Sequence, residues 1–361
     1  MKVCIIETHY HEEFLNTLLD LFDSIAEIDL YVTSKVKVSP YMIEKSKKIF
    51  YINNEEKQQK QLDKIDTSQY DLLFVNTIQP SMVDIPKWLN FTPHCKSILT
   101  LHNLNAWSNK KFILRKNIAH SIDSYITSKY TQKILKKYDI INVVHPGMIE
   151  PAQYRFNNHK IIHIPYCFAK DEIKEDKKKT IDFVIPGNVT NKRRNYEPVL
   201  QTFKEIFKKH DNIRLILLGQ VKPDMEKMIE KYNCKNLVTY KYHVEQKLYD
   251  KNLQNADFII SPSKAKTYTV NTVSEVYGLT KSSNIYEAIK WRKPIIVSNG
   301  TLLMNLLLPN YIVYGNSIGL KHIINNLIKQ PEQPEKIKQQ FFNDMKKFTK
   351  KEYMRDVKWL K

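Results

Sequence analysis

Short apolar runs alternate with amphipathic segments along the first half of the chain. Six runs of branched apolar residues have the length of buried strands: Val3–Glu7, Ile28–Thr33, Leu72–Thr77, Ser97–His102, Ile140–His145 and Ile161–Pro165. The intervening segments carry apolar residues at helical spacing, notably in Glu12–Ile25, Met42–Lys48 and His120–Lys137. This alternation predicts an α/β fold in which a parallel sheet is wound on both faces by helices.

The second half of the chain repeats the alternation. Further strands are predicted at Ile181–Pro186, Ile213–Leu218, Leu237–Tyr242, Phe258–Ser261 and Ile295–Ser298, with helices at Tyr196–Lys209 and Asp224–Tyr232. A length of 361 residues suits two domains. We therefore expect a first Rossmann-like domain over residues 1–168, a charged linker over 169–180, a second Rossmann-like domain over 181–335 and a helical segment over 336–361 that packs back on the first domain.

The composition of the chain indicates in which cellular compartment the protein works. The four cysteines lie far apart without paired spacing, which suggests neither a zinc site nor a disulfide framework and favours a reducing cytoplasm. The chain starts directly with a strand pattern rather than a secretory signal, and no apolar run reaches the roughly 18 residues of a spanning helix. The formal net charge is +19. We expect a soluble protein, or one peripheral to the inner face of a membrane.

The stretch Tyr277–Ser298, YGLTKSSNIYEAIKWRKPIIVS, predicts a loop, a short helix and a buried strand in succession. Ser282 and Ser283 are natural N-cap residues, and Lys281 stands just ahead of them. A helix N-terminus that follows a loop offers free N–H groups and a positive dipole end, which suit a phosphate. The other interpretation, given equal weight, is an ordinary helix and strand of an α/β sheet.

A second candidate phosphate site is the loop from Gly187 to Asn195. It follows a predicted strand, precedes a helix and contains the cations Lys192, Arg193 and Arg194. Guanidinium groups beside a helix N-terminus favour a diphosphate. Three adjacent cations cannot all face one ligand, so one or two of them should point to solvent.

Polar residues at predicted strand ends supply further candidates, because functional groups of open parallel sheets gather at the carboxyl ends of the strands. His102 ends an apolar run and can donate a hydrogen bond or transfer a proton. Glu7 with His9, and His145, also follow strands, but a lone histidine is more often structural. Glu287, in the helix of the central stretch, could accept hydrogen bonds from a ribose, although an isolated helix glutamate is usually only solvated.

Cations and apolar side chains alternate in the segment WSNKKFILRK. The candidates for a membrane or acceptor surface here are Trp107, Lys110, Lys111, Phe112, Arg115 and Lys116. Apolar groups of such a segment insert at a lipid interface while the cations meet anionic headgroups. A surface loop over the first domain is the equal alternative. The lysine-rich last thirty residues read slightly better as a solvated helix face.

The order of these signals resembles the glycosyltransferases of the GT-B fold, and most closely glycosyltransferase family 4. The loop Gly187–Arg194 is similar to the family's G-R-x-x-x-x-K-G loop, Asn255–Ser263 to its strand and Pro-Ser run, and Glu287–Ile296 to the second half of its E-x7-E region. Thr100–Leu104 matches the T-x-H-N-L of glycogen-synthase-like members. The resemblance implies two Rossmann-like domains facing each other across a cleft.

The resemblance also implies roles for individual residues. Arg193 falls at the family lysine that binds the donor diphosphate, and His102 at a histidine that touches the transferred sugar. Three positions depart from the pattern: Asn188 replaces an arginine, Leu279 stands at the first motif glutamate, and Glu7–His11 replaces a glycine-rich loop.

We therefore predict a glycosyltransferase that moves a sugar from a UDP- or GDP-sugar to a hydroxyl acceptor, such as a saccharide or lipid-linked saccharide of surface polysaccharide biosynthesis. No metal is expected, because fixed cations and a helix dipole can stabilise the leaving diphosphate, and no other cofactor is expected either. The resemblance implies that the anomeric configuration is retained. Two alternatives stay open: a nucleotide-sugar epimerase of similar architecture, and a non-catalytic GT-B-like binding protein. Nucleic acid is not an expected partner, since the sequence has no recognisable nucleic-acid module or run of stacking aromatics.

Overall fold

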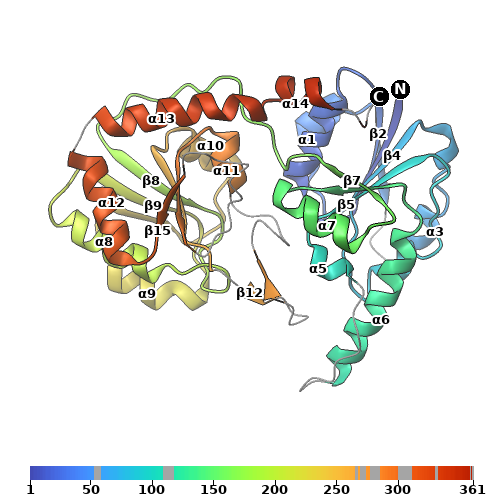
Figure 1. Cartoon of the computed structure of the whole chain (residues 1–361), viewed down its shortest axis with the longest axis horizontal. Coiled ribbons are helices and arrows are strands. Elements are labelled where there is room, and N and C mark those ends of the chain that lie inside the picture. Colours follow the sequence, from blue (N-terminus) through green and yellow to red (C-terminus); the bar gives the residue numbers. More distant parts are fainter. Residues whose placement is uncertain are drawn as a thin grey trace. The chain divides into compact units, whose positions relative to one another are not determined.

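The computed structural model describes residues 1–52, 58–108, 118–264, 267–268, 274–276, 285–299, 311–329, 332–357 and 359. The chain divides into two compact units, which are drawn together in Figure 1. Unit 1 holds the described residues of Met1–Cys167, Tyr268–Ser282 and Val357–Lys361, and unit 2 those of Phe168–Thr267 and Ser283–Asp356. Of the predicted C-terminal segment 336–361, the part up to Asp356 is grouped with unit 2 and the described residues after it with unit 1, and its packing on the first domain stays a prediction.

Unit 1 is built on a sheet of seven parallel strands in the order β3-β2-β1-β4-β5-β6-β7. The strands are β1 (Lys2–Glu7), β2 (Glu27–Thr33), β3 (Lys48–Ile52), β4 (Leu72–Thr77), β5 (Lys96–Leu101), β6 (Ile140–Val143) and β7 (Lys160–His163). The helices are α1 (Glu12–Phe22), α2 (Pro40–Lys45), α3 (Gln58–Leu62), α4 (Ile85–Trp88), α5 (Leu104–Trp107), α6 (Ile118–Leu135) and α7 (Ile149–Arg155), with 3-10 turns at Thr67–Gln69 and Pro146–Met148.

The centre of this sheet is apolar on both faces, as parallel strands covered by helices require. Every residue of β4 is buried, and so is every residue of β1 after Lys2. The two strands pair in register from Val3 with Leu72 to Ile6 with Val75, and the register then shifts so that Glu7 lies opposite Thr77. This shift places two polar side chains side by side at the carboxyl ends of the central strands.

Unit 2 contains six parallel strands in the order β10-β9-β8-β11-β14-β15. The strands are β8 (Ile181–Pro186), β9 (Ile213–Gln220), β10 (Leu237–Tyr240), β11 (Phe258–Ser261), β14 (Ile295–Ser298) and β15 (Ile312–Tyr314). The helices are α8 (Glu197–Phe207), α9 (Glu226–Tyr232), α10 (Gln246–Gln254), α11 (Ile285–Lys290), α12 (Ser317–Lys329), α13 (Glu332–Asp344) and α14 (Lys350–Asp356), with 3-10 turns at Pro223–Met225 and Met345–Phe348. The two-residue strands β12 (Thr267–Tyr268) and β13 (Ser274–Glu275) pair separately.

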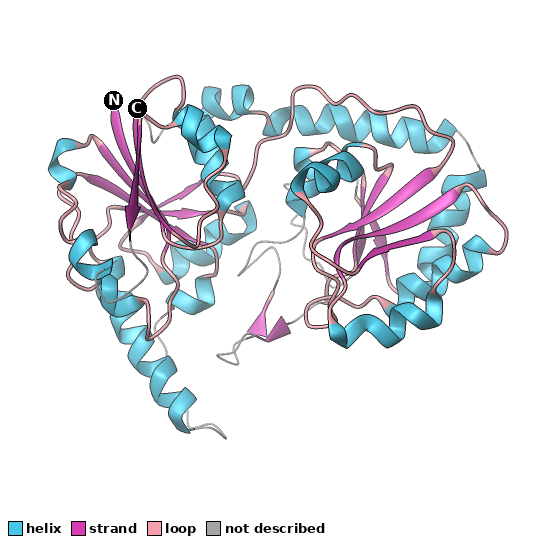
Figure 2. Ribbon diagram, turned by 180° about the vertical axis from the view of Figure 1, so that it is seen from behind, coloured by secondary structure: helices cyan, strands magenta, loops and turns pink. Residues whose placement is uncertain are grey.

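Alternate side chains of the unit 2 strands enter different hydrophobic layers. Phe183 and Phe258 stack with ring centroids 5.2 Å apart and belong to the core that α8, α9 and α12 cover. Val184 and Ile259, which point to the opposite face, are also fully buried. Figure 2 shows helices on both faces of each sheet. The predicted α/β class with two Rossmann-like domains is confirmed.

The two sheets share one topology, because each runs outward from its first strand, returns to the centre and continues on the other side. The strand order therefore reverses between β1 and β4 in unit 1 and between β8 and β11 in unit 2. In sheets of this kind ligands bind outside the carboxyl ends of the strands at that point of reversal. The fold thus directs attention to the residues after β1 and β4, and to those after β8 and β11.

Several elements were not predicted, and β3, β15 and α10 show the reason. The helix expected to run to Lys48 ends at Lys45, and β3 begins at Lys48. Residues 48, 50 and 51 of β3 are exposed, so this edge strand lacks the buried apolar run that marks the central strands. The apolar patterns of β15 and α10 are also weak. The strand β15 has only three residues, and Leu253 is the one buried side chain of α10.

Candidate functional site

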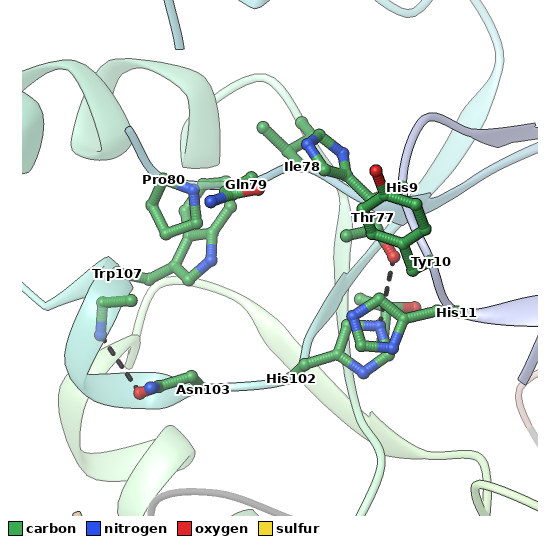
Figure 3. Close-up of a pocket in the computed structure, with 12 residues that line it drawn as sticks. His9, Tyr10, His11, Thr77, Ile78, Gln79, Pro80, His102, Asn103 and Trp107 are labelled. Atoms are coloured by element: carbon green, nitrogen blue, oxygen red, sulfur yellow. Dashed lines mark hydrogen bonds between the residues drawn. The ribbon is translucent and has the colours of Figure 1, made fainter. Parts of the chain in front are cut away.

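A cavity of about 180 Å³ lies at the carboxyl ends of the central strands of unit 1. Figure 3 shows the side chains around it, which come from the segments after β1, β4 and β5. Aromatic rings of Tyr10, His11, His102 and Trp107 line it, together with the hydroxyl of Thr77 and other polar groups. Rings with a few placed polar groups suit a sugar or another small polar ligand.

The carboxyl of Glu7 lies beneath this cavity, at the end of β1, and is completely buried. Its Oε1 accepts a hydrogen bond of 2.6 Å from the backbone N–H of His9. Its Oε2 accepts from the Thr77 hydroxyl at 2.9 Å and from the Asn76 side-chain amide. Burial raises the pKa of Glu7 to about 8, against the lowering effect of these hydrogen bonds. Glu7 therefore changes charge near neutral pH.

The imidazole of His102 is held on several sides. Its Nε2 lies 3.3 Å from Thr77 Oγ1 and 3.2 Å from the carbonyl oxygen of Asn76. The His11 ring stacks on it with centroids 3.8 Å apart, while Phe14 and Tyr166 meet it edge to face. Figure 3 shows the Thr77 contact and the stacked pair. The structure thus places His102, which was predicted to touch the substrate, in the wall of the cavity.

His9 is also buried at the cavity and faces a carboxylate. Its Nε2 lies 3.6 Å from Asp84, which contacts Lys87 and Ser81 as well. Burial alone would raise the pKa of Asp84, but hydrogen bonds and charge from His9, with Ser81 and Lys87, hold that pKa below its usual value. Asp84 is therefore ionised at neutral pH and fixes the ring of His9.

His145, the third strand-end histidine considered, has a local structural task. It is fully buried, and its Nδ1 accepts a 3.1 Å hydrogen bond from the N–H of Gly147 at the start of a 3-10 turn. Burial lowers the pKa of His145 to about 3, so the ring stays neutral. His145 therefore has a structural role, because its neutral ring caps the 3-10 turn at Pro146–Met148.

In unit 2 two glycines lie at the carboxyl ends of neighbouring strands, one after β8 and one near the end of β9. Gly187 follows β8 with φ of +88°, a conformation that other residues rarely adopt. Gly219 of β9 lies against it: a Cβ at Gly219 would come within 2.4 Å of the Gly187 carbonyl oxygen. The backbone can turn outward at this position only because both residues lack side chains.

The loop after Gly187 is anchored at two points. The Arg194 guanidinium donates to the carbonyl oxygens of Gly187 and Asn188 at 3.1 and 2.9 Å. Asp224 accepts from the Thr190 hydroxyl and from the N–H of Asn191, both at 2.9 Å. Arg194, which was predicted to bind the diphosphate, therefore holds its own loop together.

The other two loop cations are differently placed. Lys192 and Arg193 are exposed, and neither side chain has a hydrogen bond or ion pair with another residue in the part of the chain that the structure describes. Their loop lies against the end of β11, since Asn195 donates its N–H to the carbonyl of Pro262 and Arg194 forms a backbone bridge with Ser263. Two unpaired cations thus stand beside the point of strand reversal in unit 2.

Glu287 occupies the first turn of α11 and is half-buried. The hydroxyl of Tyr249, on α10, donates a hydrogen bond of 2.8 Å to its Oε1. The carboxylate is therefore held in place by a second helix rather than freely solvated. Lys293, which lies within the stretch Glu287–Ile296 that resembles the family pattern, is buried and forms an ion pair with Glu175.

Several predicted residues lie outside the described residues: the diphosphate candidates Lys281, Ser282 and Ser283, and the surface candidates Lys110, Lys111, Phe112, Arg115 and Lys116. Of the surface group, Trp107 is described. It ends α5 with 2% exposure and lines the cavity of unit 1, so it forms no part of an exposed surface.

Residues 168–343 match the sequence profile of the family described as glycosyl transferases group 1. This range contains both the Gly187 loop and Glu287. No curated protein is significantly similar to the chain in sequence.

Solved structures of similar fold cover nearly the whole chain. HepE from Anabaena, in complex with UDP, has 12% identity and a TM-score of 0.63, and the alignment covers 97% of this chain and 96% of that chain. Sucrose-phosphate synthase from Thermosynechococcus elongatus has 13% identity, a TM-score of 0.60 and coverage of 96% and 94%. A putative UDP-N-acetylglucosamine 2-epimerase from Listeria monocytogenes has 11% identity, a TM-score of 0.56 and coverage of 94% and 90%.

At these identities the structural likeness shows the fold, and residues 168–343 are in addition similar in sequence to glycosyl transferases group 1. The resemblance to GT-B glycosyltransferases that the motifs indicated is thereby confirmed. None of the helices in the described ranges has the length and hydropathy of a membrane span.

Proposed function

We propose that this protein is a glycosyltransferase that takes a sugar from a nucleotide-diphosphate sugar held by unit 2 and transfers it to a hydroxyl acceptor held by unit 1. The observation that carries the proposal is the match of residues 168–343 to glycosyl transferases group 1, because that range contains the one loop with a left-handed glycine, two unpaired cations and a following helix among the described residues.

The donor diphosphate would meet the exposed cations Lys192 and Arg193, with Lys281 and the serines Ser282 and Ser283 completing its environment. Fixed positive charge lowers the energy of the leaving diphosphate without a metal ion. Arg194 contributes indirectly by holding the loop carbonyls. Glu287, oriented by Tyr249, would accept hydrogen bonds from the ribose hydroxyls.

The cavity of unit 1 would bind the sugar being transferred and the acceptor hydroxyl beside it. Its rings provide flat apolar faces for a pyranose, and His102 would contact the sugar hydroxyls. The neighbouring HepE structure contains UDP, which makes UDP-sugars the first donors to test, followed by GDP-sugars. We propose transfer with retention of the anomeric configuration, which the anomeric proton coupling of the product would measure.

The first experiment measures thermal stability with UDP, GDP and their sugars. A ligand at about 100 times its dissociation constant stabilises a protein by roughly 2.7 kcal/mol. We expect one diphosphate nucleotide to do so, and Arg193→Ala to weaken its binding about tenfold, since a charge-assisted hydrogen bond contributes roughly 1.5 kcal/mol. Lys227→Ala is the matched control, because Lys227 is an exposed cation on α9 of the same unit.

The same experiment separates the alternatives. Stabilisation by no nucleotide in the presence of acceptor saccharides, or equal loss of binding in Lys227→Ala, would favour a non-catalytic binding protein. If the nucleotide binds but the sugar product keeps its nucleotide, the protein is an epimerase. Release of free UDP or GDP with a glycosylated acceptor supports the transferase.

We further propose that the acceptor is presented at an anionic membrane surface. The described part of this region supports it: Ile118 and Ile122 on α6 are 60% and 45% exposed, and the exposed residues Lys129 and Lys133 follow on the same helix. Exposed branched residues beside cations suit a lipid interface. Changing Lys110, Lys111, Arg115 and Lys116 to glutamine should release the protein from vesicles that contain phosphatidylglycerol, and unchanged binding would contradict the proposal.

A further inference from the structure

The cavity of unit 1 is small, and much of its wall is buried. Its volume of about 180 Å³ lies below the roughly 300 Å³ at which pockets for small molecules usually begin, so it suits one sugar ring rather than two. Thr77, Thr100 and Trp107, which line its inner part, are all buried. An acceptor whose hydroxyl meets a sugar in this cavity is therefore bound outside it, at the rim.

Two exposed side chains form this rim. Tyr10 follows β1 and is 68% exposed, and Gln79 follows β4 and is exposed as well. Both line the cavity, and neither side chain has a hydrogen bond, ion pair or ring contact with another residue of the described ranges. Figure 3 shows Tyr10 beside the stacked histidines and Gln79 on the side of Trp107. A ligand that extends out of the cavity passes between them.

The backbone on both sides of Tyr10 is held in place, although its ring is free. Before it, the N–H of His9 donates to the Glu7 carboxyl at 2.6 Å. After it, the His11 ring stacks on that of His102 with centroids 3.8 Å apart. A tyrosine side chain has two rotatable bonds, so it supplies contact area at a small cost in conformational entropy. Tyr10 therefore offers an aromatic face to a ligand from a fixed position.

The chemistry of this rim suits a neutral sugar ring. An aromatic face packs against the C–H groups of a pyranose, and a side-chain amide offers both donors and an acceptor to the sugar hydroxyls. Among the described residues that line the cavity there is no lysine, arginine, aspartate or glutamate. A phosphate or a sugar carboxylate is bound best by a fixed cation. The rim thus favours an uncharged sugar.

We propose that the acceptor is a saccharide whose reacting sugar ring stacks on Tyr10 and forms hydrogen bonds with Gln79, while the transferred sugar occupies the cavity. This inference rests on the proposed function, because it names the second substrate of the same transfer. Tyr10 lies in the segment Glu7–His11, which replaces the glycine-rich loop of similar enzymes. The aromatic rim is therefore a feature of this chain and sets its choice of acceptor.

A binding experiment on the full chain tests this proposal without nucleotide and without enzyme activity. The probes are methyl maltoside, methyl cellobioside and methyl lactoside, each compared with the methyl glycoside of its non-reducing sugar. A disaccharide, like the product of transfer, fills the cavity and the rim together. We expect at least one of the three to bind about tenfold tighter than its monosaccharide, as measured by saturation-transfer nuclear magnetic resonance.

Variants of Tyr10 separate the rim from the cavity. Tyr10→Ala should weaken binding of the disaccharide about fivefold and remove the saturation of its reducing-end ring, with the affinity of the monosaccharide unchanged. Tyr10→Phe keeps the aromatic face and should bind as the wild type does. Tyr154→Ala is the matched control, because Tyr154 is an 88% exposed tyrosine on α7 that lies outside the cavity lining. Since Tyr10 is exposed and unpartnered, its removal should leave the melting temperature unchanged.

Gln79→Ala tests the other side of the rim and should weaken binding of the disaccharide about fivefold, the equivalent of one hydrogen bond. Three results would each overturn the proposal: equal affinity for disaccharides and monosaccharides, equal effects of Tyr10→Ala and Tyr154→Ala, or no binding of any of the three disaccharides. Failure of the proposed function is measured separately, by the nucleotide titrations of unit 2. Disaccharide binding that depends on Tyr10, in a protein that binds no nucleotide, would keep the sugar-binding rim and refute the transferase.

Discussion

The two points of strand reversal occupy equivalent places in sheets of the same topology, yet their chemistry differs. Unit 1 ends its first strand with a buried carboxyl that titrates near neutral pH and connects it to a histidine. Unit 2 ends its first strand with a left-handed glycine and two exposed cations whose charge is permanent under ordinary conditions. The same backbone position thus holds adjustable charge in one unit and fixed charge in the other.

This difference suits the two tasks proposed. A diphosphate keeps its negative charge throughout binding and departure, so cations that never titrate serve it best. A sugar hydroxyl both donates and accepts hydrogen bonds, and an imidazole can do the same. The comparison predicts that unit 1 responds to pH, and that unit 2 responds to salt and to changes of backbone geometry.

The largest effect should come from Glu7. Unfolded Glu7 releases its proton near pH 4.5 and folded Glu7 near about 8, so the unfolded state binds fewer protons in that window and stability falls as pH rises. Over the whole window the loss is on the order of 4 kcal/mol, and Glu7→Gln should remove it. Urea unfolding of both proteins between about pH 5 and 9 measures the difference.

Subtraction of the two curves is necessary because other buried groups act in the opposite sense. Burial lowers the pKa values of His145 and His163 to about 3 and 4, so their contribution is lost as pH falls below about 6.5. If the free energy of unfolding depends on pH in the same way in the wild type and in Glu7→Gln, Glu7 ionises normally. The difference in titration between the two units would then be refuted.

Gly219→Ala tests the backbone requirement of unit 2. The new Cβ would overlap the Gly187 carbonyl, and the expected loss is about 3 kcal/mol, confined to the unfolding of unit 2. Gly319→Ala is the control, since Gly319 lies in α12 and its Cβ would meet only Asn316 Oδ1 at 3.6 Å. This control should change stability by less than about 1 kcal/mol. Equal effects in calorimetry would contradict the tight approach of the two glycines.

Glu287→Gln tests whether the Glu287 carboxylate, which Tyr249 holds in place, accepts hydrogen bonds from the hydroxyls of a ribose. We expect the wild type to prefer the ribonucleotide over its 2′-deoxy analogue about tenfold, and the variant to lose most of that preference, because a charged acceptor contributes roughly 1.5 kcal/mol. Isothermal calorimetry with UDP and 2′-deoxy-UDP, or the GDP pair, measures it. Glu230→Gln, an exposed glutamate on α9, should leave the preference unchanged.

The smallest effect concerns salt. Since Lys192 and Arg193 are exposed, their attraction for a diphosphate is screened, and affinity should fall on the order of threefold between about 0.05 and 0.5 M salt. In Arg193→Ala this dependence should be weaker. Affinity that is insensitive to salt but changes with pH near about 8 would assign the nucleotide to unit 1 instead.

Much of the fold could be predicted because buried parallel strands have continuous apolar sequences. The strands Ile181–Pro186, Phe258–Ser261 and Ile295–Ser298 have the predicted bounds. The candidate site could be predicted from the sequence only in part. Gly187 and His102 could be proposed as site residues because a glycine or a histidine at a strand end is recognisable in the local sequence. The hydrogen bond between Glu7 and Thr77 could not, because it depends on the shifted register of two strands far apart in the sequence. Arg194 shows the same limit, because its hydrogen bonds to the carbonyls of its own loop cannot be recognised in the sequence.

Trp359 gives the chain an unusual order of assembly during synthesis. Its ring packs on Phe22 of α1 with centroids 6.5 Å apart, and its carbonyl accepts from Lys96 Nζ at 3.1 Å, so unit 1 gains contacts from a residue that follows all of unit 2. On the ribosome, where domains generally fold as they emerge, the first unit must wait with Phe22 uncovered by Trp359 until the second has been translated. During that interval Phe22 lacks the apolar contact that Trp359 makes with it in the finished protein.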